Sequence, residues 1–362
     1  MSNHEAGLNM VLFEPRSDWV PRLNFPNIAD NGTIAIDVET HDPGLLKCGP
    51  GGIRQHGKVV GISLTANDQS HYFPIDHMGG GNLDRTPVVK YFKDLLRSPH
   101  RFVVGHNILY DGEWLSTLGS EVHGKLVDTL VVEALIDEEA DSYSLQNVAK
   151  RRLNEEKDET LLREAANCYG IDPKSDLWKL HSKFVGPYAE QDTALLPRIL
   201  KEQMKIIHAE HSEDILELEC RVTRVLWEMR RQGIPVDLDV AAQLSARLKV
   251  REDELRSELL HQYGRHVDEW SGPQIASMCD ELKIFYPRTP KGNPSFTSEW
   301  LGDQDHPLLV GIVGLRELNR MRSTFVDSWI FDNAYKGRVY PVWHQLNSDE
   351  GCTRTGRLSG YW

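Results

Sequence analysis

Asp37 and Glu39 stand two residues apart in the run TIAIDVE, which is rich in β-branched residues. Side chains alternate between the two faces of a strand, so both carboxylates would project from one face while Ile36 and Val38 point to the other. Two ionised acids on one face of an apolar strand are costly unless a salt-bridge partner or a divalent cation neutralises them. The pair indicates a metal site or, as the alternative, an ordinary surface or capping role.

Two further sets of residues have spacings that suit chemistry. His106, Asn107 and Asp111 follow the run RFVVG and lead into a helical pattern, which puts Asp111 near the carboxyl-terminal edge of a sheet, where α/β sites tend to form. Tyr188 and Asp192 are four residues apart in a helical segment and therefore share one face. Each set also has a structural explanation: a turn at Asn107, a favourable charge at a helix start for Asp111, and packing for Tyr188.

Short apolar runs bounded by Gly, Pro and Asp predict the strands that would carry these residues. The predicted strands cover residues 33–39, 59–65, 71–75 and 101–105. Helical patterns cover residues 87–96, 112–118, 144–153 and about 187–207. Pro187 suits a first helical position, and Pro197 predicts a kink or break in the last helix. About the first 205 residues thus predict one α/β domain.

The pattern changes after about residue 212. Apolar residues at spacings of three and four predict one helix with an apolar stripe: Ile215, Leu218, Val222, Val225 and Met229. A second helix has its own apolar face: Leu244, Leu248, Leu255, Leu259 and Tyr263. Gly233 and Pro235 would end the first helix, Asp237 or Asp239 would cap the second, and Gly264 would end it. Two adjacent amphipathic helices suggest an antiparallel pair.

Taken in order, D-x-E on a strand, N-x-x-x-D at a strand-to-helix junction and Y-x-x-x-D on a late helix resemble the three motifs of DEDD exonucleases in their tyrosine variant. The resemblance implies a ribonuclease H-like fold, with a mixed sheet flanked by helices, and two divalent metal ions, Mg²⁺ or Mn²⁺. The implied metal ligands are Asp37, Glu39, Asp111 and Asp192. Tyr188 would orient the attacking water, since its ordinary pKa of about 10 makes it a poor base at neutral pH. Asn107 and His106 would contact the terminal nucleotide.

Segments of the second half resemble family-A DNA polymerases related to DNA polymerase I. They cover residues 221–237, 271–282, 289–301, 306–327 and 355–359. By this resemblance the chain divides into a 3′-5′ exonuclease domain (1–205), a mostly α-helical thumb-like region (206–345) and a truncated start of the palm (346–362). Arg357, in the final T-G-R-L-S element, would contact the primer-template duplex, because Arg suits phosphate or groove contacts.

Composition limits the protein class. The 362 residues are 40% apolar, enough for two folded domains, and the net charge of −13 argues against a simple basic nucleic-acid coat without excluding an enzyme on DNA. Five separated cysteines form no C-x-x-C pair, which disfavours a disulfide framework or zinc site. We find no apolar run of about 18 residues and no signal peptide, so we expect no membrane association and a location in the cytoplasm of a bacterium or phage-infected cell.

Together these inferences predict a metal-dependent 3′-5′ exonuclease that proofreads DNA 3′ ends at a primer-template during replication. The polymerase palm and fingers are absent from the sequence, so we expect either a split gene, as in a phage, or a piece of a longer polymerase. A split would require a second polypeptide that carries the palm and fingers. Two alternatives remain: a non-catalytic scaffold or DNA-binding half of a polymerase, and an RNA exonuclease similar to ribonuclease D, whose acid cluster would look the same.

Overall fold

The computed structural model describes residues 13–345 and 357–361, which form two compact units. The first unit comprises residues up to Gln232 and the segment from Pro341 onward, and the second comprises Gly233–Tyr340. The boundaries of these units differ from the predicted ones, which follow residues 205 and 345. The first boundary lies later than predicted because helix α8 (Glu213–Gln232) packs in the first unit. Most of the predicted palm segment, including Thr355 and Gly356, lies outside the described residues.

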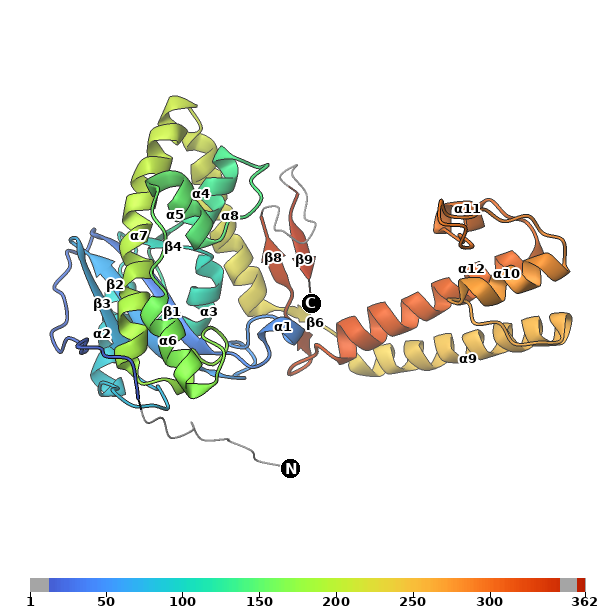
Figure 1. Ribbon diagram of the computed structural model, residues 1–362, viewed down its shortest axis with the longest axis horizontal. Helices are drawn as coiled ribbons and strands as arrows, with labels where there is room; N and C mark the ends of the chain where they lie inside the picture. Colours follow the sequence, from blue (N-terminus) through green and yellow to red (C-terminus); the bar gives the residue numbers. More distant parts are fainter. Residues whose placement is uncertain (1–12, 346–356, 362) are drawn as a thin grey trace. The chain divides into compact units, whose positions relative to one another are not determined.

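A five-stranded sheet with helices around it forms the first unit (Figure 1). Its strands are β1 (Thr33–His41), β2 (Lys58–Ala66), β3 (Gln69–Pro74), β4 (Phe102–Gly105) and β5 (Lys125–Asp128). Besides α8, its helices are α1 (Leu45–Cys48), α2 (Arg85–Leu96), α3 (Ile108–Thr117), α4 (Thr129–Ile136), α5 (Leu145–Leu153), α6 (Thr160–Tyr169), the 3₁₀ turn η1 (Leu177–Lys179) and α7 (Ser182–Ala209). Strands β8 (Val342–His344) and β9 (Ser359–Tyr361) form a separate antiparallel pair.

The sheet is mixed, with strand order β3-β2-β1-β4-β5 and β1 at its centre. β1, β2 and β3 are antiparallel neighbours, and β4 and β5 run parallel to β1. The β2-β3 reversal is a two-residue turn in which Asn67 and Asp68 have φ of +51° and +58°, values that Asn and Asp tolerate. The parallel strands are joined through helices, so the chain leaves β4 and enters α3 beside the central strand.

Alternation along β1 sends its residues into two layers. Ile34, Ile36 and Val38 belong to the apolar core that α2 and α3 close on one face. Asp37 and Glu39 lie on the opposite face, which α7 covers by packing on β1, β2 and β3. Each fully buried aliphatic side chain contributes roughly 1.5–3 kcal/mol, so the apolar layer fixes which face the acids occupy. The predicted separation of the acids from Ile36 and Val38 is confirmed.

The other predicted elements of this unit are observed with shifted ends, but β5, α4 and α6 were not predicted. Pro187 is not a first helical residue, because α7 already begins at Ser182, where the His181 side chain accepts a hydrogen bond from the backbone of Lys183. A kink or break was predicted at Pro197, and the helix does not break there. α7 continues through this residue because Leu196, next to it, is buried against the sheet and outweighs the lost backbone bond.

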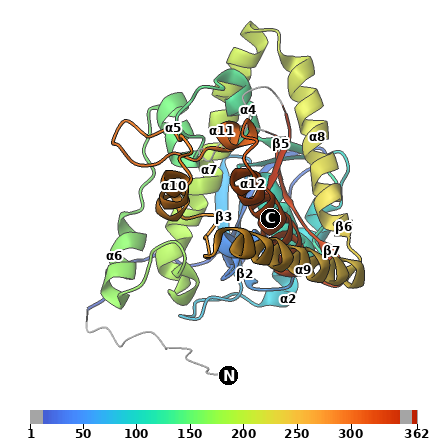
Figure 2. The same ribbon diagram turned by 90° about the vertical axis from the view of Figure 1, so that its right-hand side faces the viewer.

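The second unit is helical apart from the pair β6 (Ile234–Pro235) and β7 (Arg338–Val339). Its helices are α9 (Leu238–Tyr263), α10 (Gly272–Glu281), α11 (Ser298–Gly302), α12 (Pro307–Asn319) and the π-helical η2 (Arg320–Phe331). α9 and α12 lie side by side (Figures 1 and 2), and they share an apolar core with α10 and α11. As predicted, Asp237 caps α9 and Gly264 ends it, with φ of +75°.

The predicted antiparallel pair of the first and second long helices is wrong. α9 pairs with α12 and η2, whereas α8 packs on β5 and α3 within the first unit. A buried ion pair accounts for part of the α9 packing: Glu252 is fully buried, and Arg322 of η2 donates to it at 2.8 Å. Removal of one partner of such a pair would leave a buried charge uncompensated.

This architecture confirms the predicted fold class, a mixed sheet flanked by helices that is followed by a mostly α-helical region. Over residues 13–345 and 357–361, no helix is both long and apolar enough to cross a membrane. The four cysteines in these ranges are free thiols.

We expect Gly112→Ala to destabilise the first unit. Gly112 follows Asp111 in α3, and an added Cβ would lie 2.0 Å from the buried Trp227 ring of α8. One of the two helices would have to move, and overpacking of this kind costs about 1–3 kcal/mol. Denaturant unfolding measures the loss, with Gly302→Ala as control because a methyl group there meets no atom within 4 Å. An equal loss in both variants would contradict the packing explanation.

Candidate functional site

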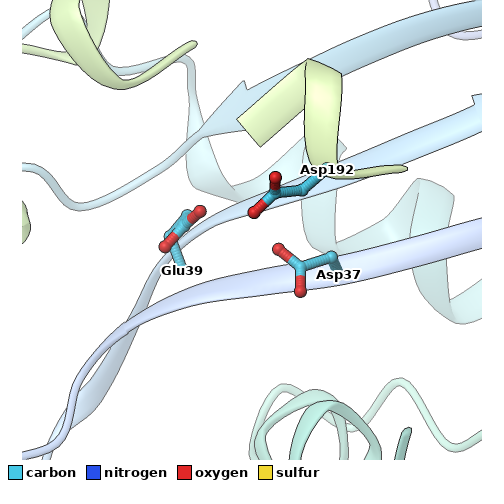
Figure 3. Close-up of side chains that lie close together, drawn as sticks. All are labelled: Asp37, Glu39 and Asp192. Atoms are coloured by element: carbon cyan, nitrogen blue, oxygen red, sulfur yellow. The ribbon is translucent and has the colours of Figure 1, made fainter. Parts of the chain in front are cut away.

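Three carboxylates converge where α7 crosses β1 (Figure 3). Asp37 and Glu39 leave β1 on the same face and Asp192 comes from α7, and one oxygen from each lies within 4.8 Å of the others. Glu39 and Asp192 are 7% and 5% exposed, while Asp37 keeps partial contact with solvent. The pairing register of β1 with β2 shifts directly after Glu39, a bulge of the kind that redirects side chains near functional sites. The three acids form a compact group that a cation could bridge.

Asp111 approaches the same strand from α3. Its Oδ1 accepts a hydrogen bond from the backbone N–H of Val38 at 3.1 Å, and the residue is buried. Asp111 therefore lies beside the strand between the two β1 acids, although it is not a member of the three-carboxylate group. Burial, followed by the negative charge of Asp37, raises the pKa of Asp111 well above its ordinary value.

Asp128, which the sequence reasoning missed, holds the loop that leads to Asp111. Its Oδ1 accepts from the backbone N–H groups of Asn107 at 2.9 Å and Leu130 at 3.0 Å, and its Oδ2 accepts from Ile108 at 2.9 Å. These bonds satisfy free N–H groups at the starts of α3 and α4. They also hold Asn107 in the left-handed conformation, with φ of 65°. An acid between the run KLV and a helical pattern is a capping signal that could have identified Asp128.

The acids raise one another's pKa values. Burial, followed by the charge of Asp192, raises the pKa of Asp37 to about 7. Burial and then the charge of Asp37 raise the pKa of Glu39 well above its ordinary value. Burial also raises the pKa of Asp192, against the opposing positive charge of Lys157. Like charges at this separation repel strongly when little water screens them, so a bound divalent cation would stabilise the ionised form of the group.

The donor set fits a hard divalent cation. All candidate ligands are carboxylate oxygens, which Mg²⁺ and Mn²⁺ favour. The Nζ of Lys157 lies 2.6 Å from Asp192 Oδ1 and 2.8 Å from Oδ2, but only the contact with Oδ2 has the geometry of a hydrogen bond. Asp192 Oδ1 is buried and accepts no hydrogen bond from the described residues. A buried carboxylate oxygen that accepts no hydrogen bond, next to other carboxylates, is suited to ligate a metal ion that displaces the Lys157 ammonium from it.

Tyr188 lies one turn before Asp192 on α7. Burial, followed by the negative charge of Asp192, raises the pKa of its phenol well above the ordinary value. The hydroxyl therefore stays protonated at neutral pH and can donate or accept a hydrogen bond, but it cannot serve as a base. The Nζ of Lys157 is 3.4 Å from this hydroxyl. Lys157 was not predicted, and no pattern signals it because 35 residues separate it from Asp192.

The three residues predicted to contact substrate are in different environments. Asn107 is exposed at the N-terminus of α3. The His106 ring pairs with the Thr129 hydroxyl and the Tyr143 carbonyl oxygen, both at 2.8 Å, so its two nitrogens are engaged inside the domain. Arg357 is exposed.

A cavity of about 740 Å³ opens beside the acids, and both Glu39 and Asn107 line it. Asp37 and Asp192 are not part of its lining, so the acid group lies at its border. Aromatic rings form other walls: the His41 ring stacks on Trp178 with centroids 4.0 Å apart, and the Tyr110 hydroxyl is 2.6 Å from that of Thr40. Ligand sites typically measure about 300–1,000 Å³, so this cavity is large enough for a nucleotide.

Comparisons with known proteins point to one family. The model of the 3′-5′ exonuclease domain of family-A DNA polymerases matches residues 24–208. A DNA-directed DNA polymerase of Pseudomonas phage M6 is 36% identical over 356 residues, which cover 95% of this chain and 54% of the relative. DNA polymerase I of Pseudomonas aeruginosa is 25% identical over 373 aligned residues, which cover 98% of this chain and 38% of the relative.

A solved structure shares the fold. It is the POL domain of Pol1 from M. smegmatis in complex with a DNA primer-template and dNTP, with a TM-score of 0.63 and 19% identity over 91% of this chain and 51% of that chain. The chain thus spans about half the length of the phage relative and of this structure. From the family match over residues 24–208, the chain belongs to the family of 3′-5′ exonuclease domains of family-A DNA polymerases.

Proposed function

We propose that this protein is a metal-dependent exonuclease that removes nucleotides from the 3′ ends of DNA and releases 5′-nucleotides. The observation that carries the proposal is the convergence of Asp37, Glu39 and Asp192, whose ligand oxygens lie within 4.8 Å of one another in a member of an exonuclease family. Raised pKa values of buried acids next to a cavity mark candidate active sites, which supports the assignment.

Each residue of the site has a proposed role. Asp37, Glu39, Asp111 and Asp192 would hold two divalent ions, Mg²⁺ or Mn²⁺. Such ions, when bound, supply an activated water and stabilise the leaving 3′ oxygen. Tyr188 would hold the attacking water by a hydrogen bond from its hydroxyl, which keeps its proton at neutral pH. The hydrogen bond from Val38 N–H fixes one oxygen of Asp111 and leaves the other available.

The cavity is the proposed seat of the terminal nucleotide. Asn107 offers an amide that can donate to or accept from a sugar or base, and it lies on the lining together with Glu39. Trp178, stacked on His41, offers an aromatic surface. Stacking on aromatic rings accepts any base, as an editing enzyme requires. The ring nitrogens of His106 are engaged within the domain, so we propose a structural role for this residue.

Editing of a family-A polymerase is the proposed biological role. We propose that the protein acts in the cytoplasm of a bacterium or phage-infected cell, on primer-template DNA. Nucleotide addition would need a palm and fingers, carried by a second polypeptide if the gene is split or by the same polypeptide if this chain is a piece of a longer polymerase, and Arg357 would contact the duplex. A pull-down with the tagged chain from phage-infected cells tests for a second polypeptide. Recovery of a polymerase lacking its own exonuclease domain would support the split, and recovery of the chain alone would contradict it.

Two other functions would be consistent with some of these features. A non-catalytic scaffold would keep the fold without the activity, but the presence of all four acids and Tyr188 argues against it. An RNA exonuclease similar to ribonuclease D would use the same acids. The similarity of the phage M6 DNA polymerase across 95% of the chain, beyond the exonuclease domain, favours DNA.

The double substitution Asp37→Ala/Glu39→Ala should abolish Mg²⁺-dependent removal of 3′ nucleotides, because it deletes two of the three converging carboxylates. We expect a loss of at least about 10³-fold, measured on a mismatched primer-template and on single-stranded DNA and RNA, with and without EDTA. Faster loss of RNA would identify an RNA-trimming enzyme. No activity of the wild type on any substrate would support the scaffold alternative.

Tyr188→Phe should lower the single-turnover rate by about 10–100-fold at saturating metal, because the water loses one hydrogen bond while the ring keeps its packing. Tyr91→Phe is the matched control, since its hydroxyl donates to the carbonyl oxygen of Pro26 and makes no contact with the acids. Quenched-flow hydrolysis of single-stranded DNA measures both. An unchanged rate for Tyr188→Phe would remove the hydroxyl from the proposed mechanism.

A further inference from the structure

Lys157 is unusually well shielded from solvent for a lysine. Its side chain is 7% exposed, and that of its partner Asp192 is 8% exposed. The other lysines in the described lysine–carboxylate ion pairs have side chains at least 25% exposed. A buried ammonium is costly unless a charge or several acceptors compensate it, so the position of Lys157 requires an explanation within the acid group.

The contacts of Lys157 lie inside the candidate metal site. Its Nζ is 2.6 and 2.8 Å from the two oxygens of Asp192, and it is 3.4 Å from the Tyr188 hydroxyl. The same nitrogen sits over the Tyr188 ring, 4.5 Å from the centroid, at a distance typical of cation–π contacts. One ammonium thus touches both residues that α7 contributes to the site.

The segment that carries Lys157 is held in place on both sides. It connects α5 to α6, and the backbone N–H of Lys157 donates to the side chain of Gln146 in α5 at 3.3 Å. The next N–H, of Asp158, donates to the side chain of Gln191 in α7 at 2.9 Å. Because Gln191 precedes Asp192 directly, the loop is fastened to the helix at the point where the ammonium meets the carboxylate.

We propose that Lys157 is a positioning residue that acts as a built-in cation of the metal site: it competes with divalent metal for Asp192 and holds Asp192 and Tyr188 in their working orientations. The inference rests on the proposed function, because it presumes that the acids bind metal. Lys157 would therefore lower the affinity for metal while it raises the rate of hydrolysis. Those two effects have opposite signs, and a residue with a merely structural role would not produce both.

The affinity effect follows from charge. An ammonium in contact with both oxygens of Asp192 repels any second cation bound there, and poor screening strengthens this repulsion. Its removal leaves the carboxylates with less positive charge nearby, so a divalent ion should bind more tightly. The rate effect follows from geometry, since Lys157 is the cation that contacts both the Asp192 carboxylate and the Tyr188 ring.

The test compares Lys157→Met, Lys157→Gln and Lys157→Arg with the wild type, using the full metal-stripped chain. Calorimetric titration with Mn²⁺ should give at least about tenfold tighter binding for the Met and Gln variants. Single-turnover hydrolysis of single-stranded DNA at saturating Mn²⁺ should be at least about tenfold slower for both. Arg should keep the wild-type affinity to within about threefold because the charge remains, yet it should be slow because a planar guanidinium cannot reproduce the single-point contact.

Lys150→Met is the matched control, because it removes the same charge from the preceding helix, where Lys150 pairs with Glu156 and is 62% exposed. Neither its affinity nor its rate should change. Thermal unfolding without metal verifies that each variant is folded, and Gln keeps a donor for Asp192 if the Met variant does not fold. Weaker or unchanged Mn²⁺ binding in a folded, uncharged Lys157 variant would overturn the proposal, as would an equal change in Lys150→Met.

The titration of the wild type separates this inference from the proposed function. A folded wild-type protein that binds no Mn²⁺ overturns both. A wild type that binds Mn²⁺ and degrades DNA, beside Lys157 variants of unchanged affinity, overturns only the role of Lys157. Tighter binding and slower hydrolysis in the uncharged variants, with neither change at Lys150, is the result that supports it.

Discussion

Repulsion among Asp37, Glu39, Asp111 and Asp192 is the constraint on which the first unit depends. Their pKa values are all raised, with burial as the largest cause, and the charges of neighbouring acids further disfavour the ionised forms of Asp37, Glu39 and Asp111. Two further interactions offset it: the N–H of Val38 donates to Asp111, and Lys157 pairs with Asp192. The apolar layer on the other face of β1 supplies the stability that lets the strand carry two acids at all.

Several interactions stabilise the position of helix α7 on the sheet despite the repulsion among the acids. Leu196 packs with Ala35 of β1 and Val104 of β4, which seats the helix on the sheet close to Asp192. Farther along, Gln203 donates to the fully buried carboxylate of Glu133 at 2.9 Å, and Arg151 and Arg152 of α5 pair with the same group. This network joins α4, α5 and α7, so both sets of contacts hold the helix on the C-terminal side of Asp192.

Much of the site was predictable because its signals are local. Alternation in TIAIDVE predicts Asp37 and Glu39 on one face opposite Ile36 and Val38, and the structure has that arrangement. The order of the three motifs and their helix and strand contexts pointed to the family, which the match over residues 24–208 bears out. β5 escaped prediction because its four residues, KLVD, place only two apolar residues between two charged ones, whereas the equally short β4, FVVG, is a continuous apolar run. Asp128 at the end of β5 nevertheless supports the start of α3. At Pro197 the helix does not break, and Leu196 beside it is packed against the sheet, an interaction between distant segments that the local rule for proline does not include.

The parts that sequence patterns did not reveal are those decided between distant segments. The apolar stripe predicted for α8 is largely exposed, with Leu218 51% and Val225 55% accessible, because the buried face is set by Trp227 and Arg230 instead. Arg230 forms an ion pair with Glu113 of α3, so a charged residue lies on the buried face of α8. Hydrophobic periodicity alone predicts only apolar residues on that face. Lys157 is a second example, since its side chain is shielded from solvent beside Asp192, a residue of a distant segment. Acids that share one strand or one helix face leave a periodic trace, whereas their counter-charges can come from any segment that folding brings near. Carboxylates of a metal site are therefore easier to find from sequence than the cations that balance them.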